Sequence, residues 1–119
     1  MALTPMEFDD TNSLQEYTPT YETGFSGGTG TQRYKMLDDE LVYLEGFFAK
    51  TSAISGAVYV CTLPSGIRPK NVTAVNISAG DGNSYYFASG TLFTNGKLLV
   101  KCEGTAAKRV YVNTVYSIK

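Results

Sequence analysis

The chain has 119 residues, of which 43% are hydrophobic and 13% aromatic, and a formal net charge of −1. This length suits one domain with a single core, and no apolar run approaches the roughly 18 residues that a membrane-spanning helix needs. The slightly acidic total argues against nucleic-acid binding, and a chain without histidine is not expected to hold a metal or another cofactor.

Charge is divided unevenly along the chain. Residues 1–50 carry nine acidic and three basic side chains, whereas residues 51–119 carry two acidic and seven basic ones. The two halves can neutralise each other within one domain, or the asymmetry can favour contacts between copies. The beginning, MALTPMEFDDTNS, has no signal-peptide pattern, so folding in a cytoplasm is expected. In that compartment Cys61 and Cys102 are predicted to be half-buried strand thiols, with a disulfide as the alternative.

Residues 1–31 differ in composition from the rest of the chain. They contain five acidic residues and no basic one, and they end in the glycine-rich TGFSGGTGT. Three aromatic residues, Tyr17, Tyr21 and Phe25, recur at intervals of four, which is unusual for a solvated tail. The segment is predicted to be an N-terminal arm. It is either disordered or ordered by packing on its own domain, on another copy or on a larger assembly.

Residues 32–119 are rich in the β-branched and aromatic residues that are typical of strands. The run ELVYLEGFFAK, after the acidic turn at Asp38–Asp39, is apolar on both faces of an extended strand. One face carries Val42, Leu44 and Phe48, and the other carries Leu41, Tyr43 and Phe47. The second face is predicted to be an oligomer interface, since a small sandwich cannot bury both faces of every strand. The alternative is that the arm covers this face in a monomer.

Turn signals divide the rest of the chain into short strands. GAVYVCT is predicted as a strand in which Val58 and Val60 alternate with Tyr59 and Cys61. NVTAVNISA and SYYFASG are expected to form a hairpin through DGN at 81–83.

The dipeptide Asn95–Gly96 predicts a two-residue hairpin turn with positive φ at both positions. The last strand alternates cleanly, with Val110, Val112, Thr114, Tyr116 and Ile118 on one face. About eight such strands predict an all-β protein, an antiparallel β-sandwich of jelly-roll type.

A loop rich in proline, TLPSGIRPK, separates two of these strands. Pro64 and Pro69 fix φ, and Gly66 is expected to permit the bend. The loop is therefore predicted to be a stiff corner that carries the chain from one sheet to the other. Arg68 is expected to be held there by carboxylate or carbonyl acceptors, with contact to a ligand as the alternative.

Four motifs stand out together: VYLEG at 42–46, LPSGIRP at 63–69, NGKLLV at 95–100 and an aromatic residue near the end, Tyr116. In this order they resemble the small C-terminal head domain of bacteriophage tail-fibre, baseplate and related virion proteins. The resemblance covers roughly residues 32–119. It implies a β-sandwich that usually forms a homotrimer, often binds saccharides of the host cell surface and belongs to a virion assembled in the bacterial cytoplasm.

The sequence therefore favours a non-enzymatic virion component for host attachment. Rigid loops with aromatic and polar side chains suit sugar binding. The candidate patch is Asp81, Asn83, Tyr85 and Tyr86, which as an alternative is ordinary hairpin chemistry. The second hypothesis is a structural decoration, collar or adaptor protein attached to other virion proteins through its arm. Catalysis is not expected, because histidine is absent and the Asp9–Asp10 and Asp38–Asp39 neighbours point to opposite faces of an extended chain.

Overall fold

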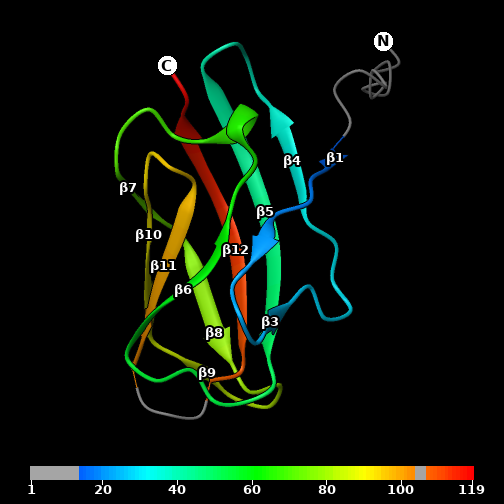
Figure 1. Cartoon of the computed structure of the whole chain (residues 1–119), viewed down its shortest axis with the longest axis vertical. Coiled ribbons are helices and arrows are strands. Elements are labelled where there is room, and N and C mark those ends of the chain that lie inside the picture. The colour runs from blue at the N-terminus through cyan, green and yellow to red at the C-terminus, as the bar shows by residue number, and fades with distance from the viewer. Residues whose placement is uncertain (1–13, 104–106) are drawn as a thin grey trace, which may run out of the picture.

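The computed structural model describes residues 14–103 and 107–119, which form two antiparallel sheets packed face to face (Figure 1). The larger sheet has the order β1 (Gln15–Glu16), β4 (Arg33–Met36), β5 (Leu41–Lys50), β12 (Arg109–Ser117), β8 (Ile77–Gly80) and β9 (Tyr85–Tyr86), and β3 (Phe25–Ser26) also pairs with β5. The smaller sheet has the order β2 (Thr20–Tyr21), β6 (Ala57–Thr62), β11 (Lys97–Cys102), β10 (Ala88–Leu92) and β7 (Thr73–Val75). The all-β sandwich is confirmed.

Strands β5 and β12 form the centre of the seven-stranded sheet. They pair in antiparallel fashion over nine residues each, from Leu41 opposite Ser117 to Ala49 opposite Arg109. Burial alternates along both strands as predicted, because every second side chain points between the sheets. The inward side chains of the two strands are Val42, Leu44, Phe48, Val110, Val112, Thr114 and Tyr116. Their outward partners form a second surface that is only partly covered.

Two of the predicted strands are each divided between the sheets. NVTAVNISA becomes β7 in the five-stranded sheet and β8 in the seven-stranded sheet, with Asn76 between them. SYYFASG likewise becomes β9 and β10, with Phe87 between them. At the first change of sheet, the Asn76 N–H donates to Thr114 Oγ1 at 3.2 Å. These two positions, and not the proline loop, carry the chain between the sheets in this region.

The proline loop connects β6 to β7, two strands of the same sheet, so the predicted crossing between sheets is wrong. It contains the 3-10 helix η2 (Ser65–Ile67) and lies at the end of the sandwich near the C-terminus (Figure 1). The Tyr116 hydroxyl donates to the Ile67 carbonyl at 2.5 Å, and the Lys70 N–H donates to the Ser117 carbonyl at 3.1 Å. The loop therefore closes this end of the sandwich by bonding to the end of β12.

The β10–β11 hairpin has a different turn from the one predicted. Only Gly96 has positive φ, at 86°, and Asn95 does not. The Gly96 N–H donates to the Phe93 carbonyl, and the Phe93 N–H donates to the Lys97 carbonyl, both at 2.9 Å. This pattern is a three-residue loop, a type I turn followed by a left-handed glycine. In this turn only the glycine needs positive φ, and Asn95 keeps a negative φ.

A β-bulge in β6 changes which of its side chains are buried. The register with β11 shifts between Leu98 and Leu99, so that Val60 and Cys61, although adjacent, are both fully buried. The simple alternation predicted for this strand is therefore wrong at Cys61, because a bulge adds one residue to one strand. Cys61 and Cys102 are both free thiols. Both are buried, more deeply than predicted.

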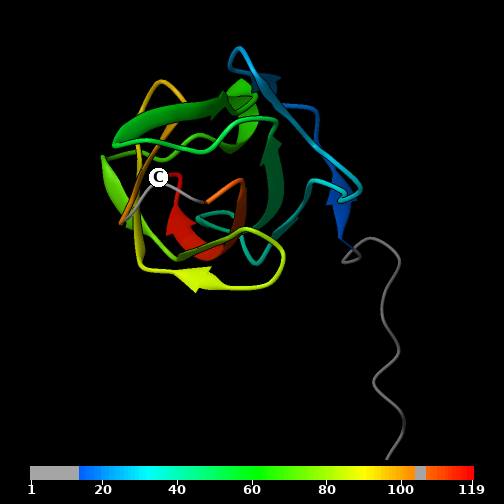
Figure 2. The same cartoon turned by 90° about the horizontal axis from the view of Figure 1, so that it is seen from below.

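Residues 14–31 pack along one flank of the sandwich (Figure 2). Strand β1 joins the seven-stranded sheet, β2 the five-stranded sheet and β3 the seven-stranded sheet again. Tyr17 and Phe25 from this segment are buried in the same core as the central strands. The described part of the arm is thus ordered by packing on its own domain, one of the alternatives left by the sequence, and it ties the two sheets together.

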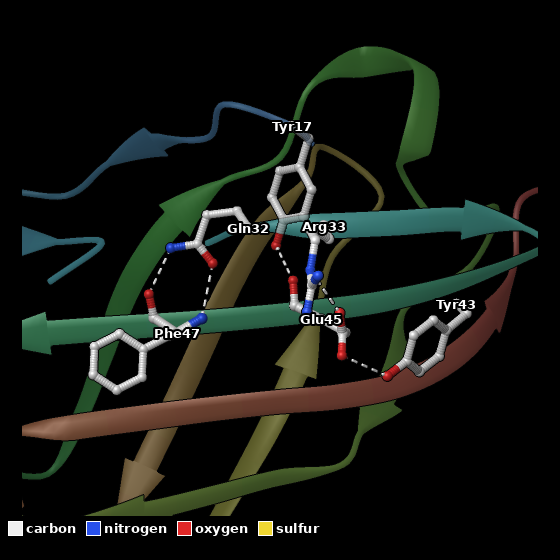
Figure 3. A network of polar contacts seen from close by, with 6 residues as sticks. All are labelled: Tyr17, Gln32, Arg33, Tyr43, Glu45 and Phe47. Atoms are coloured by element: carbon white, nitrogen blue, oxygen red, sulfur yellow. Dashed lines mark hydrogen bonds and ion pairs between the residues drawn. The ribbon is translucent and has the colours of Figure 1, made fainter. Parts of the chain in front are cut away.

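The side chain of Gln32 fills a gap along the edge of β5. Strand β4 pairs with β5 only as far as Glu45, and β3 pairs with it again at Ala49. Between them the Phe47 N–H donates to Gln32 Oε1 at 2.8 Å, and Gln32 Nε2 donates to the Phe47 carbonyl (Figure 3). Gln32 is only 5% exposed. Its amide therefore satisfies backbone groups that a strand residue would otherwise bond.

Candidate functional site

The predicted patch begins in the four-residue loop 81–84 between β8 and β9. Asp81 Oδ1 accepts hydrogen bonds from the N–H groups of Asn83 and Ser84, and its Oδ2 accepts one from the Tyr86 hydroxyl, each at 2.8 Å. These bonds, those from the Asn83 and Ser84 N–H groups first, lower the pKa of Asp81 to about 2. Asp81 and Tyr86 thus hold the loop in shape, while the Asn83 side chain is exposed.

Two aromatic side chains next to this loop are exposed to solvent. Tyr85 is 81% exposed, and Phe87, two residues further along, is 77% exposed. Tyr86 points to the other side of β9 and packs against the core. Both tyrosines are predicted from the sequence, whereas Phe87 is missed, although its spacing from Tyr85 in an extended strand is an available signal.

Strand register places Tyr85 on the outer face of the seven-stranded sheet. Tyr85 lies opposite Gly80, and Gly80 lies opposite Arg109. Two residues after Arg109 on the same face of β12, Tyr111 lies opposite Phe47 of β5. Their rings meet edge to face with centroids 5.1 Å apart. We call these four side chains, Phe47, Tyr85, Arg109 and Tyr111, the tyrosine face.

Tyr111 is at the centre of the tyrosine face, because it lines three depressions. The first, of about 30 Å³, is shared with Tyr85 and Asn83 and has room for about one water molecule. The second, of about 280 Å³, lies between Tyr111 and Arg109. The third, also of about 280 Å³, lies on the other side of Tyr111 and is bordered by Asn113. The second and third depressions are shallow grooves between the arm and the outward side chains of β5 and β12.

A polar cluster adjoins the third depression (Figure 3). Arg33 Nε lies 3.1 Å from Glu45 Oε1, and the Tyr43 hydroxyl donates to Glu45 Oε2 at 3.0 Å. Burial and this hydrogen bond raise the pKa of Tyr43. The buried Tyr17 hydroxyl donates to the Glu45 carbonyl at 2.9 Å. The charges of Arg33 and Glu45 are therefore largely compensated by each other.

The predicted oligomer-interface residues are half-buried, and the structure separates them into two groups. Leu41 and Tyr43 lie towards the proline-loop end of β5, and Val115, which is opposite Tyr43 and 50% exposed, extends their apolar surface. Phe47 lies further along, close under the arm. A Cβ added to Gly30 would collide with Phe47 Cβ, so the arm needs glycine here. The arm thus covers part of the predicted interface.

The corner residues have structural contacts. Arg68 Nε donates to the Leu63 carbonyl at 3.0 Å, as the sequence predicted for a carbonyl acceptor. Pro64 precedes η2 and Pro69 follows Arg68. Gly66 lies within η2 without positive φ, so it does not supply the bend, contrary to the prediction. A groove of about 410 Å³ lies between this corner and the arm.

Burial disfavours the reactive thiolate form of both cysteines. Burial raises the pKa of Cys61 to about 12 and also raises the pKa of Cys102. Within the described part of the chain, no three His, Cys, Asp or Glu side chains gather closely enough to hold a metal ion. The same residues include no helix long and apolar enough to cross a membrane. The predicted acidic pair Asp9–Asp10 lies outside the described residues.

No protein-family model matches the chain, and the curated proteins contain no match. A functional assignment therefore depends on the geometry above and on the motifs in the sequence.

Proposed function

We propose that this protein is a non-enzymatic bacteriophage virion component whose sandwich attaches to saccharides of the host cell surface. The sequence motifs support the virion assignment, and the tyrosine face supports the binding role. The observation that carries the proposal is that Tyr111 lines two grooves of about 280 Å³ each, with the exposed Tyr85 beside it across a small depression. Flat aromatic faces contact the apolar side of a sugar ring, and nearby amide and guanidinium groups bond to its polar groups.

The shape of the loop favours this role. Asp81 fixes loop 81–84 through three hydrogen bonds, so Tyr85 and Asn83 are held in place before any ligand binds. A rigid loop loses little conformational entropy on binding. In this arrangement Asp81 and Tyr86 are positioning residues, and the sugar contacts Asn83, Tyr85 and Tyr111.

The experiment is to measure binding of the purified protein to bacterial lipopolysaccharide and teichoic acid by isothermal titration calorimetry. Tyr85→Ala and Tyr111→Ala should each weaken binding about tenfold, as loss of an aromatic anchor does. Tyr59→Ala, on the outer face of the five-stranded sheet, is the matched control and should bind normally. Circular dichroism establishes that each variant is folded. Equal binding by all variants would contradict the proposed site.

A structural role is the second candidate, as a decoration, collar or adaptor protein of the virion. The observation that favours it is that both Asp81 oxygens are already bonded within the loop, which contains space for only about one water molecule. In this case the intact protein binds no saccharide, and its arm attaches it to other virion proteins. Deleting residues 1–13, which keeps strands β1, β2 and β3 and the buried Tyr17 and Phe25, would then abolish incorporation into particles.

A homotrimer is part of the proposal. The apolar surface of Leu41, Tyr43 and Val115 lies towards the proline-loop end of the sheet, away from Tyr85. Copies that associate through this surface would leave the tyrosine face open to the host. The protein would then present several equivalent saccharide sites, which increases avidity without any new contact.

A further inference from the structure

Arg109 carries the formal charge among the four side chains of the tyrosine face. Within residues 14–103 and 107–119, the ion pair found is that of Arg33 with Glu45, and Arg109 has no carboxylate partner. Arg109 lies opposite Gly80 of β8, and the acidic residue next to this pair is Asp81, directly after Gly80. Its two oxygens are bonded to Asn83, Ser84 and Tyr86. Among the described residues, Arg109 is thus an exposed positive charge without an internal counter-charge.

The position of Arg109 is well defined by its neighbours. Its guanidinium lies over Gly82, where an added Cβ would be 2.8 Å from Arg109 Nη1. It borders the groove of about 280 Å³ that is also lined by Phe47 and Tyr111. On its other side the residue in register is Gly80, which has no side chain to separate Arg109 from Tyr85. A planar cation therefore lies against the turn at Gly82, at the margin of the groove that Phe47 and Tyr111 also line.

From this arrangement we infer that the saccharide recognised by the tyrosine face is acidic, with its anionic group paired to Arg109. The inference rests on the proposed function and specifies its ligand. A guanidinium forms two parallel hydrogen bonds with a carboxylate or a phosphate, and such charge-assisted bonds are stronger than neutral ones. The sugar ring stacks on Tyr111 while its acid group reaches Arg109. Both uronic acids and sugar phosphates present this chemistry.

The test compares each acidic sugar with a neutral counterpart of the same sugar. Binding of oligogalacturonate is measured by calorimetry beside that of its neutral methyl ester, and binding of mannose 6-phosphate beside that of mannose. The acidic member should bind about tenfold more tightly in at least one pair, and that pair identifies the acid as a carboxylate or a phosphate. Added salt should reduce the preference, because ions screen exposed charges.

Arg109→Gln should abolish the preference, so that the acidic and the neutral member of that pair bind with equal affinity. Lys101→Gln, an exposed cation on the other sheet, is the matched control and should retain the preference. Equal binding of charged and neutral members by the wild type would overturn the acidic-sugar inference while leaving the proposed function standing. If Tyr111→Ala also leaves every measured affinity unchanged, the proposed function itself fails.

Discussion

Gly96 is the residue at which a side chain would do most harm to the proline corner. Its φ is 86°, and an added Cβ would lie 2.7 Å from Arg68 Nε and 2.8 Å from the Leu63 carbonyl oxygen. A Cβ added to Gly66, in the same corner, would have no heavy atom within 4 Å apart from those of its chain neighbours. Gly96 and Gly66 are therefore a matched pair: glycine is required at position 96, whereas position 66 has room for a side chain.

We expect Gly96→Ala to lower the free energy of unfolding by about 2 kcal/mol, from backbone strain and contact with the Arg68 side chain. Gly66→Ala should change it by less than about 0.5 kcal/mol, because the helical backbone accepts alanine. Urea denaturation of both variants measures the difference. Equal stability of the two variants would show that Arg68 and the hairpin do not form this contact in solution.

The carboxyl of Asp81 makes the loop sensitive to acid. Its pKa is lowered from 3.8 to about 2, so folding favours the ionised form. The stabilisation is complete above pH about 4 and is lost as the pH falls through about 2. In an NMR titration, the amide resonances of Asn83 and Ser84 should move with a midpoint near 2. A midpoint at the ordinary value would mean that these N–H groups do not bond to Asp81.

At the scale of elements, the arm is an integral part of the sandwich, and its contribution can be measured. Phe25 in β3 is buried in the core, and the ammonium group of Lys50 lies 5.4 Å from its ring centroid. Phe25→Ala should reduce the free energy of unfolding by roughly 3 kcal/mol. Phe87→Ala removes the same side chain from an exposed position and should cost less than about 0.5 kcal/mol.

Thermal and urea unfolding of these two variants distinguish a packed arm from a loose one. If Phe25→Ala were as stable as Phe87→Ala, residues 14–31 would not be tied to the two sheets in solution.

Strands whose own residues divide regularly between two faces could be predicted from the sequence. The alternation along β5 and β12 is an example, because a strand between two environments repeats every two residues. Strands β1, β2 and β3 could not be predicted, since each contains only two residues and exists through its partner. The bulge in β6 and the division of NVTAVNISA at Asn76 also depend on neighbouring strands. Local propensity does not contain that information.

The same distinction applies to the candidate site. Asn83 and Tyr85 can be predicted because Asn83 lies in a recognisable turn and Tyr85 comes shortly after it. Tyr111 and Arg109 cannot, although they lie beside Tyr85, because their proximity follows from the register of β12 with β8 and of β8 with β9. A single sequence does not indicate which strands are neighbours. The resemblance to virion head domains gives no information on this surface either.

For the whole molecule, the proposed trimer depends on the surface formed by Leu41, Tyr43 and Val115. Light scattering should give three times the mass of one chain at micromolar concentration. Val115→Glu should dissociate the trimer, because it places a charge within an apolar contact. Tyr59→Glu, on the opposite outer face, should leave the mass unchanged. A wild-type monomer would contradict the trimer, whereas the tyrosine face is complete within one chain.

The most direct test of the central claim is to map the bound saccharide on the intact protein by amide NMR, using oligogalacturonate and mannose 6-phosphate as ligands. The tyrosine face is predicted to respond to at least one of them, with the largest shifts at Tyr85, Arg109 and Tyr111 and with none at Tyr59. Shifts confined to the five-stranded sheet, or no shift with either ligand at millimolar concentration, would contradict a saccharide site on the outer face of β5, β12 and β9.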